Sequence, residues 1–209
     1  MRVCHRNLSL IWYSAASYGA GRLIKRSLDI VGAIIGLVIL SPVLLLVGLA
    51  VRLESPGPAL HWSSRVGRDN NLFLMPKFRS MRIDAPDVAT HLLPDPDRWI
   101  TPLGRFLRRH SIDEFPQLWS ILKGDMSFVG PRPALHSQAD LMDLRNQAGV
   151  QILRPGLTGW AQVNGRDELP IPEKARLDAE YLAKRSVFLD LWIISRTAIT
   201  AFSGRGIRH

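Results

Sequence analysis

The chain has 209 residues, and its 27 Lys and Arg against 18 Asp and Glu give a formal net charge of +9. This charge favours partners that carry phosphate, namely nucleic acid, anionic lipid or nucleotide substrates, but does not choose among them. The single cysteine, Cys4, excludes an intramolecular disulfide and fits a reducing compartment, and the sequence holds no zinc-type Cys/His spacing, glycine-rich phosphate loop or internal repeat.

The first element along the chain is an apolar segment. Ile30 to Val51 contains 22 residues without a charge, and this length crosses a bilayer core of about 30 Å. Ser41 and Pro42 lie at its midpoint, where a proline removes a helix hydrogen bond and clashes with the preceding turn. We therefore predict a membrane helix that breaks at Ser41-Pro42, with the freed backbone groups bonded by Ser41 or by water.

Basic residues stand on both sides of this segment. Arg22, Lys25 and Arg26 precede it, and Arg52 opens a longer series of Lys and Arg after it. Because Lys and Arg concentrate on the cytoplasmic flanks of membrane segments, both ends are expected on the cytoplasmic side. A re-entrant helix meets this expectation, and a kinked helix that spans the membrane is the alternative.

The pattern divides the chain into an N-terminal extension (residues 1–21), the membrane segment (22–53) and a compact domain (54–209) of a size that holds one core. Asp29 lies at the edge of the apolar segment, three residues after Arg26. This carboxylate either pairs with Arg26 or Arg22 or remains solvated at the boundary.

The domain opens with a predicted β-hairpin. Ala59 to Trp62 and Leu72 to Lys77 are short extended stretches around the polar turn Gly67 to Asn71. The following stretch, Asp84 to Asp97, is rich in aspartate and proline and lacks apolar periodicity, so we predict a loop.

Helical patterns follow at Leu103 to Arg109 and at Ile112 to Lys123, and Gly124 stands where a C-cap glycine is expected. Apolar side chains recur at helical spacing in the second helix, which predicts that they lie in the core. These side chains are Phe115, Leu118, Trp119 and Leu122.

Turn-forming residues fill Arg154 to Gly159, and two further helices are expected at Glu173 to Lys184 and at Val187 to Phe202. The last helix is amphipathic and either packs on the core or lies on a membrane surface. The fold is thus predicted to be α+β and mainly helical, with a re-entrant helix-break-helix, a small β-hairpin and amphipathic interfacial helices.

The chemistry is concentrated between Arg105 and Pro133. Ser111 and Glu114 have the spacing of a capping box, in which both side chains satisfy free amides at a helix start. Pro116 disfavours a helix that begins at Ile112, so a helix that begins at Pro116 is the alternative. In either case Asp113 and Glu114 lie close to a helix N-terminus, where carboxylates and phosphate groups are both favoured.

Phosphoryl transfer requires a nucleophile and cations that neutralise charge on the phosphoryl oxygens. Asp113 or Glu114 could attack the phosphorus, and Arg108, Arg109 and Arg132 could neutralise the phosphoryl oxygens. The simpler alternative for these arginines is a solvated basic face. Prolines on both sides of Arg132 stiffen its backbone and reduce the entropy lost on binding phosphate. His110 and His136 have no sequence partner and receive no role.

An ordered series of short motifs runs from Ile24 to Thr197. The motifs are Lys25-Arg26 with Asp29, Ser41-Pro42, Glu54-Ser55, Gly57-Pro58, Lys77-Phe78-Arg79-Ser80-Met81, Thr101-Pro102-Leu103-Gly104, Ser111-Ile112-Asp113-Glu114, Leu122-Lys123-Gly124-Asp125-Met126-Ser127, Gly130-Pro131-Arg132-Pro133 and Arg154-Pro155-Gly156-Leu157-Thr158-Gly159-Trp160. In these motifs the chain resembles the monotopic polyprenyl-phosphate phosphoglycosyl transferases, the bacterial sugar transferases that start the assembly of surface glycans.

The resemblance implies a magnesium-dependent reaction in two steps. Asp113 would attack the sugar-bearing phosphate of a UDP-sugar, UMP would leave, and the phosphosugar held on Asp113 would pass to polyprenyl (undecaprenyl) phosphate. Glu114 would help Asp113 to hold Mg²⁺. Arg108 and Arg132 would bind phosphate groups, and we expect Lys77 and Arg79 to join them.

The resemblance also implies a domain half-sunk in the cytoplasmic leaflet of the bacterial inner membrane, where the enzyme would open O-antigen, capsule, exopolysaccharide or glycoprotein synthesis. Ile112 and Phe115 stand where leucines are usual, and His110 where a small hydroxyl residue is common, which affects local packing only. No further membrane spans precede Arg22, which predicts a minimal catalytic unit.

The expected partners are the UDP-sugar, polyprenyl phosphate and membrane lipid, without nucleic acid, and a homo-oligomer is left open. A membrane-tethered basic module that binds anionic lipid or nucleic acid is the competing hypothesis, and a purely structural membrane anchor is the third. A nucleic-acid module predicts Lys and Arg spread over one face with stacking aromatics. The enzyme predicts arginines that converge on Asp113 and Glu114. The sequence does not identify the sugar.

Overall fold

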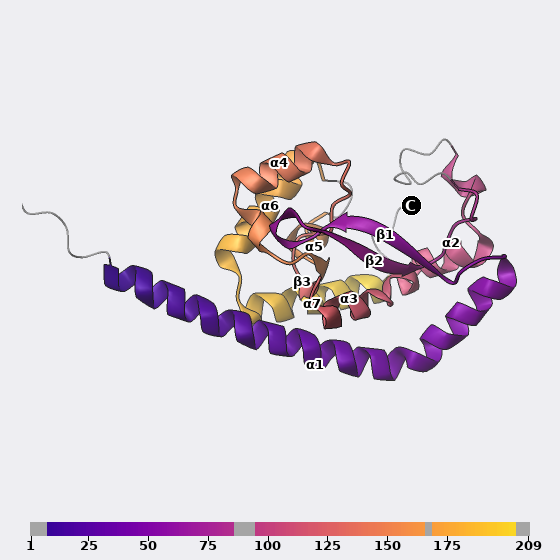
Figure 1. Cartoon of the computed structure of the whole chain (residues 1–209), viewed down its shortest axis with the longest axis horizontal. Coiled ribbons are helices and arrows are strands. Elements are labelled where there is room, and N and C mark those ends of the chain that lie inside the picture. Colours follow the sequence, from indigo (N-terminus) through magenta and orange to yellow (C-terminus); the bar gives the residue numbers. More distant parts are fainter. Residues whose placement is uncertain (1–7, 86–94, 166–168, 204–209) are drawn as a thin grey trace, which may run out of the picture.

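The computed structural model describes residues 8–85, 95–165 and 169–203 (Figure 1). The α-helices are α1 (Leu8–Glu54), α2 (Pro102–Arg109), α3 (Gln117–Lys123), α4 (Ala139–Gln147), α5 (Trp160–Val163), α6 (Ile171–Lys184) and α7 (Val187–Ser203). The strands are β1 (Leu60–Val66), β2 (Leu72–Phe78), β3 (Ser127–Val129) and β4 (Gly156–Thr158). Short 3₁₀ helices are η1 (Arg68–Asn70), η3 (Pro96–Arg98), η4 (Ile112–Glu114) and η5 (Val150–Ile152). The prediction of a mainly helical fold with a small β-hairpin is confirmed.

Helix α1 is continuous over 47 residues and includes Pro42. The proline has no N–H for the carbonyl of Val38 four residues earlier, and the Ser41 hydroxyl donates to that carbonyl at 2.8 Å. The prediction that Ser41 satisfies a freed backbone group is confirmed. The predicted break, however, is not seen, because the chain stays helical through Pro42 and instead changes direction in the C-terminal half of α1 (Figure 1). Re-entry into a membrane stays a prediction.

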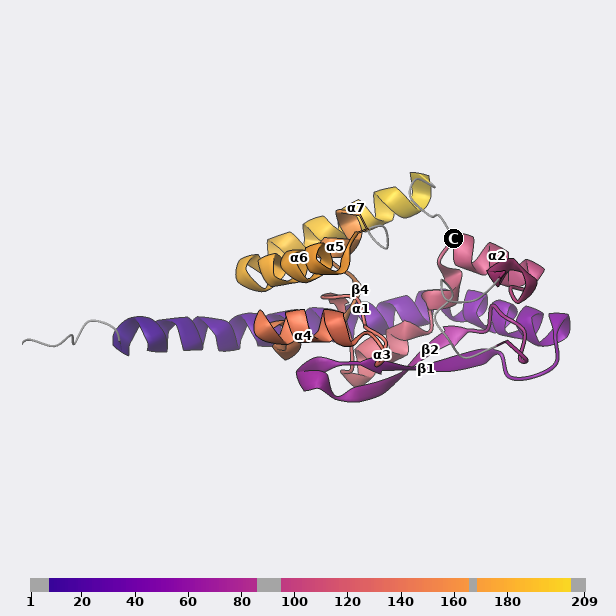
Figure 2. The ribbon, with the colours of Figure 1, turned by 90° about the horizontal axis from the view of Figure 1, so that it is seen from above.

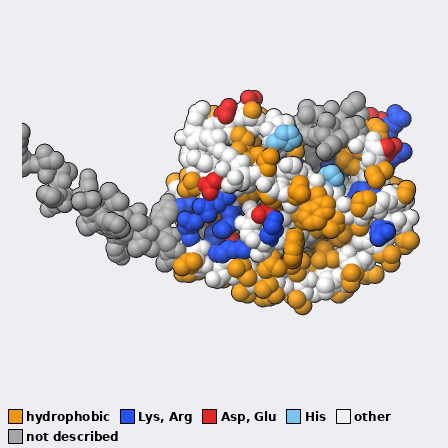
Figure 3. All heavy atoms as spheres, in the orientation of Figure 1, with side chains coloured by type: hydrophobic (Ala, Val, Ile, Leu, Met, Phe, Trp, Pro, Cys, Tyr) orange, Lys and Arg blue, Asp and Glu red, His pale blue; other side chains and the backbone are white. Residues whose placement is uncertain are grey.

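The surface of α1 is largely apolar. Gly21–Glu54, with 34 residues, is the one helical stretch within the described residues that is long and apolar enough to cross a membrane, and an 18-residue window inside it has a mean hydropathy of 2.9. Hydrophobic side chains line the lower edge of the molecule, where α1 runs (Figure 3). Thirteen of them are at least one-third exposed: Leu23, Ile24, Leu28, Val31, Ile34, Ile35, Val38, Ile39, Val43, Leu45, Leu46, Leu49 and Leu53. An uncovered apolar belt of this length suits an apolar environment such as a membrane.

Two glycines spaced four apart let the rest of the chain pack closely on α1. A Cβ at Gly32 would stand 2.9 Å from the Phe128 ring, and one at Gly36 would stand 3.0 Å from Leu118. In membrane helices this small-residue spacing often joins two helices. Here the glycine face is occupied by residues of the same chain, which fixes the globular part onto α1.

The hairpin β1–β2 is confirmed, with a longer first strand than predicted. The two strands pair antiparallel from Leu60 opposite Phe78 to Val66 opposite Leu72. At the turn, Asp69 and Asn70 adopt left-handed backbone conformations with φ of 55° and 61°. Short polar side chains tolerate this region best, which explains a turn rich in Asp and Asn.

A second sheet joins β3 and β4 in parallel, with Ser127 opposite Gly156 and Val129 opposite Thr158. The backbones approach so closely that a Cβ at Gly156 would lie 2.1 Å from the amide nitrogen of Gly130. We predicted only turns at Arg154 to Gly159. That prediction missed the short strand β4, because the strand forms by pairing with the distant β3 and its residues show no alternating pattern along the chain.

Helices α6 and α7 lie on one side of α1 and the hairpin lies on the other (Figure 2). Asp190 of α7 ties these parts together, since it accepts hydrogen bonds from Tyr181 of α6 at 2.7 Å and from Lys25 of α1 at 2.5 Å. Ile193 is fully buried, whereas Phe188 is 86% exposed. Helix α7 therefore packs by one face and leaves an apolar face uncovered.

Two sequence interpretations were wrong. Asp29 is neither solvated nor paired with an arginine, because it is 5% exposed and accepts hydrogen bonds from the Ser127 hydroxyl and the Phe128 amide, both at 3.1 Å. Trp119 is 53% exposed and lies outside the core that contains Leu118. Most of the loop predicted at Asp84 to Asp97, and residues 1–7 of the predicted extension, lie outside the described residues, while residues 8–21 continue α1.

Candidate active site

The segment between α2 and α3 makes a compact series of turns. Ser111 has φ 55° and ψ 22°, a left-handed conformation that costs a non-glycine residue about 1–2 kcal/mol. Its side chain makes no capping hydrogen bond, so the capping-box interpretation was wrong. The alternative is supported, because Pro116 stands at the N-cap of α3 and η4 precedes it as a separate turn. Gly124 ends α3 with φ 105°, as predicted. Strain of this kind is often found at functional sites.

Asp113 lies within η4 and is only 7% exposed. Burial raises the pKa of its carboxyl group above the usual range, and the like charge of Glu114 raises it further. Lys77 and Arg108 act in the opposite direction. The structure thus brings together four of the predicted site residues. A buried carboxylate with a perturbed pKa and cations nearby is typical of a reactive group.

Glu114 forms an ion pair with Lys77 of β2, with 3.0 Å between Nζ and Oε1. Both side chains are partly exposed and line a small polar cleft. The cleft residues come from the hairpin, η4, α3, the loop after β3 and strand β4: Arg65, Met75, Lys77, Glu114, Gln117, Arg132, Pro133, Gly156 and Leu157. Three cationic side chains therefore share one cleft with the Glu114 carboxylate.

Arg132 lies in the loop after β3, and its backbone is held by a buried ion pair. The Arg145 guanidinium donates to the Arg132 carbonyl at 3.0 Å. The same group donates twice to the Asp178 carboxylate, at 2.9 and 2.7 Å. Arg145 and Asp178 are 7% and 1% exposed. This pair of α4 and α6 fixes the backbone from which Arg132 extends.

Arg79 lies apart from these residues. Its guanidinium donates to the carbonyls of Val51, Ser55 and Pro56, at distances of 2.7 to 3.3 Å, and to the Ser55 hydroxyl. The residue is 7% exposed. Its contacts are those of a C-cap for α1, so we do not include Arg79 in the proposed phosphate site. The two cations of the motif Lys77-Phe78-Arg79 therefore have different surroundings: Arg79 donates to three carbonyls and one hydroxyl, whereas Lys77 pairs with a carboxylate.

The sequence interpretation missed Arg65 and Gln117 as cleft residues. Successive strand residues point to opposite faces, and the register places Arg65 on the same face as Lys77. Because we ended the first predicted strand at Trp62, this alternation was not extended to Arg65. Among the residues left without a role, His110 is exposed and its Nδ1 contacts the Phe106 carbonyl at 2.9 Å.

The opposite face of the hairpin lines an apolar groove with a volume of about 540 Å³. Leu60 and Trp62 of β1 and Pro76 and Phe78 of β2 form one wall, and α1 and the start of α3 form the others. The remaining lining residues are Leu37, Leu44, Leu45, Gly48, Leu49, Arg52, Ala59, Pro116 and Trp119. The hairpin therefore separates a polar cleft from an apolar groove, and Trp119 is exposed because it borders that groove.

The donor groups suit a divalent cation only in part. Within the described residues no group of three or more His, Cys, Asp or Glu side chains could hold a metal ion. Asp113 and Glu114 offer two adjacent carboxylates whose repulsion contributes to the raised pKa of Asp113. Mg²⁺ commonly takes one or two carboxylates and completes its shell with water and substrate phosphates. The pair fits this mode of binding.

Residues 20–204 match the family described as bacterial sugar transferase. The match covers most of the chain, and the chain therefore belongs to the bacterial sugar transferase family. The resemblance seen in the sequence motifs is confirmed.

Several curated proteins are similar. A UDP-glucose:undecaprenyl-phosphate glucose-1-phosphate transferase of Escherichia coli (strain K12) is 40% identical over 91% of this chain and 42% of its own length. A UDP-N-acetylgalactosamine-undecaprenyl-phosphate N-acetylgalactosaminephosphotransferase of Aeromonas hydrophila is 37% identical over 88% of this chain and 45% of its own length. A protein of Caulobacter vibrioides with the same name as the first is 45% identical over 83% of this chain and 67% of its own length. The chain thus spans less than half of the first two relatives.

Proposed function

We propose that this chain transfers a sugar-1-phosphate from a UDP-sugar to polyprenyl (undecaprenyl) phosphate and releases UMP, as the first membrane step of glycan synthesis. The observation that carries the proposal is the convergence of cations on one acidic pair. Arg65, Lys77 and Arg132 line the cleft that holds Glu114, and Arg108 acts electrostatically on Asp113 beside it. The names of the relatives, which act on undecaprenyl phosphate, support the same reaction.

In the first step a carboxylate oxygen of Asp113 attacks the phosphorus that bears the sugar. The bond from this phosphorus to the bridging oxygen breaks, and UMP leaves with the electron pair. An acyl phosphate then joins Asp113 to the sugar. In the second step an oxygen of the lipid phosphate attacks the same phosphorus, the bond to Asp113 breaks, and the carboxylate is restored. Two displacements replace one difficult transfer, which is the usual advantage of covalent catalysis.

The surroundings of Asp113 suit a nucleophile. Burial removes water from the carboxylate and raises its pKa, and Lys77 and Arg108 oppose part of that rise because their positive charges favour the ionised form. Arg132 and Arg65 neutralise the charge of the donor's diphosphate, and the ion pair of Arg145 and Asp178 holds the Arg132 backbone in place.

Asp113 and Glu114 are the residues that would hold Mg²⁺. The cation would neutralise phosphate charge during transfer. Without it, the two adjacent carboxylates repel each other, which favours protonation of Asp113. The chain's own contribution is the Lys77 ammonium, which fixes the Glu114 carboxylate at 3.0 Å.

The apolar groove supports the membrane half of the reaction. It lies between the hairpin and α1, and the hairpin strand that supplies Lys77 to the cleft supplies Pro76 and Phe78 to the groove. A polyprenyl chain in the groove would thus end within a strand's width of the acidic pair. The exposed belt of α1 and the apolar face of α7 would lie in the cytoplasmic leaflet of the inner membrane, with the polar cleft open to cytosolic nucleotide sugars.

The test is UMP release by the purified chain in detergent with Mg²⁺, polyprenyl phosphate and UDP-sugars, among them UDP-glucose and UDP-N-acetylgalactosamine. Asp113→Asn should lower the rate by at least about 10⁴-fold, since it removes the nucleophile. Asp143→Asn, which changes an exposed aspartate on α4, is the matched control. Without lipid, intact-protein mass should rise by one phosphosugar in the wild type and the control only.

Equal UMP release from the wild type and Asp113→Asn would remove Asp113 as the nucleophile. Release that requires no lipid and leaves no mass increase would contradict the covalent step. Failure with every donor would overturn the proposal and favour the membrane-tethered basic module.

A further inference from the structure

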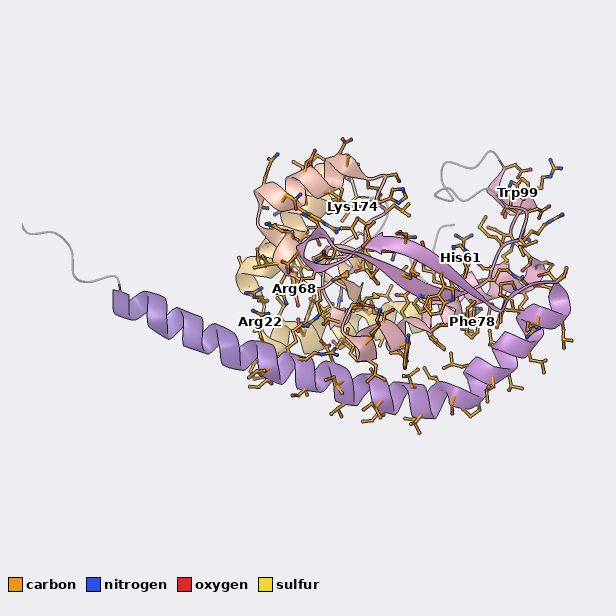
Figure 4. The ribbon with its side chains drawn as sticks, in the orientation of Figure 1. Arg22, His61, Arg68, Phe78, Trp99 and Lys174 are labelled. Carbon is orange, nitrogen blue, oxygen red and sulfur yellow. The ribbon has the colours of Figure 1, made fainter. Side chains whose placement is uncertain are left out.

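Four arginines from three segments that are distant in sequence gather at the C-terminal end of α3. They are Arg22 and Arg26 of α1, Arg68 of the hairpin turn and Arg154, which precedes β4. We name this group the arginine cluster. Figure 4 places Arg22 and Arg68 close to one another, and Figure 3 shows Lys and Arg side chains gathered there beside the hydrophobic lower edge.

Part of the cluster is used by the fold. Arg26 donates to the carbonyls of Ile121 and Leu122 at 2.6 and 2.9 Å, and Arg154 donates from Nε to the Gly124 carbonyl at 2.8 Å. These bonds satisfy the free carbonyls at the end of α3. The carbonyls carry only partial negative charge, however, so the guanidinium groups keep most of their positive charge.

Within the described residues, nearby carboxylates balance only part of that charge: Asp125, next to Gly124, is paired with Lys123, and Asp29 acts favourably on Arg154. Arg68 has one carboxylate partner, Asp69, at 3.1 Å, and both side chains are more than one-third exposed. The Asp29 carboxylate is already used by β3. The pKa of Arg154 is lowered by burial and then by the like charges of Arg26, Arg68 and Arg22. Such mutual repulsion favours an anion that the four groups can share.

The cluster also borders the apolar surface. Leu23, Ile24 and Leu28 stand beside Arg22 and Arg26 on α1 and are 72%, 54% and 51% exposed. An anion that meets these arginines would thus have apolar surface immediately next to it. A phospholipid supplies both a phosphate and acyl chains, whereas a soluble phosphate supplies only the first.

From this placement we propose that the arginine cluster binds the headgroup of an anionic phospholipid, whose acyl chains lie against the exposed face of α1. The site is separate from the proposed active site, because the acidic pair precedes the N-terminus of α3 and the cluster lies at its C-terminus. The seven residues of α3 put about 10 Å between these ends. Binding here would fix the depth and tilt of α1 at the membrane surface.

The test measures lipid binding to the full chain in a neutral detergent by native mass spectrometry, with phosphatidylglycerol, phosphatidylcholine or inorganic phosphate added. The double variant Arg22→Gln/Arg68→Gln removes two charges that do not cap α3. The matched control Arg82→Gln/Arg105→Gln removes two charges from exposed side chains elsewhere, which are 58% and 61% exposed.

The wild type and the control should bind phosphatidylglycerol at least tenfold more tightly than phosphatidylcholine. The cluster variant should lose about 25-fold in affinity for phosphatidylglycerol, since each of the two basic residues near an anionic surface contributes about fivefold. Equal affinity of the two lipids, or an equal loss in both double variants, would overturn the proposal. Inorganic phosphate that binds as tightly as phosphatidylglycerol would also overturn it and assign the cluster to free phosphate. UMP release by the cluster variant without phosphatidylglycerol should match the wild type, which shows that the variant is folded.

Discussion

The two ends of α3 carry charges of opposite sign, and the chain surrounds them in different ways. At the C-terminal end, Arg26 and Arg154 donate to helix carbonyls and stabilise the fold. At the N-terminal end, Asp113 is buried beside a second carboxylate, so that its pKa is raised and its charged form is disfavoured. Both signs suit the helix dipole. Only the C-terminal charges, however, are placed where they also stabilise the fold.

The two ends of α3 therefore differ in their effect on stability: the arginines at the C-terminal end stabilise the fold, whereas the buried carboxylate at the N-terminal end does not. A carboxylate that costs stability is retained when its function requires it, whereas arginines that cap a helix need no further explanation. The acidic end therefore depends on supports supplied by other elements: Lys77 from the hairpin, and the buried pair of Arg145 and Asp178 behind Arg132.

The largest expected effect on stability comes from breaking the buried ion pair of Arg145 and Asp178. Asp178→Ala leaves Arg145 buried without its carboxylate and should reduce the free energy of unfolding by about 3–5 kcal/mol, because an unpaired buried charge is costly. Thermal unfolding in detergent measures the change. Glu173→Ala breaks an exposed ion pair with Arg176 and should change the free energy of unfolding far less, because water screens this pair. Equal losses in the two variants would contradict a supporting role for the buried pair.

At the opposite end of α3, Arg26→Gln removes two charge-assisted hydrogen bonds to helix carbonyls. The free energy of unfolding should fall by about 1.5–3 kcal/mol. The rate of UMP release per folded molecule should stay within about twofold of the wild type, since Arg26 lies at the other end of the helix from Asp113. A large loss of activity in folded protein would contradict the view that the C-terminal end of α3 serves stability and not catalysis.

Asp113→Asn should have the opposite effect on stability. Because burial raises the pKa of Asp113 in the folded state, wild-type stability declines as the pH rises through the interval above 3.8, the ordinary pKa of the group. The asparagine variant avoids this loss and should unfold at a higher temperature than the wild type at pH 7, as thermal unfolding in detergent would measure. The gain should vanish below pH 3.8. A variant that is less stable at pH 7 would show that the carboxylate contributes to the fold.

The smallest effect concerns the electrostatics of the acidic pair. Lys77→Met removes a charge that lowers the pKa of Asp113, so the acid limb of the first half-reaction should move to higher pH. Lys123→Met at the other end of α3 removes a charge paired with Asp125 and should leave the limb in place. Rapid-quench measurement of UMP release across pH gives both profiles. An unmoved limb in Lys77→Met would exclude Lys77 as a determinant of that pKa.

The local sequence was sufficient for the elements whose patterns are short in range. The apolar run of α1, the hairpin turn at Asp69 and Asn70, and the C-cap at Gly124 follow from composition and backbone preference alone. The acidic pair was identified as a candidate catalytic pair from residue type and position, and the family of the chain was identified from the order of motifs. Short-range pattern also predicted the role of the Ser41 hydroxyl, because its acceptor lies on the preceding turn.

Tertiary structure decided the features that depend on contacts between distant segments. Asp29 appeared to be a boundary charge, yet its partners are Ser127 and Phe128, about a hundred positions away. Lys77 of β2 and Arg79, which follows the strand, share one motif, but only the packing of α1 and η4 gives them different partners. The sequence by itself therefore identified the candidate acidic pair and the long apolar segment. Which charges cap helices and which converge on the cleft was set by packing, because burial and pairing act through space and have no period along the chain.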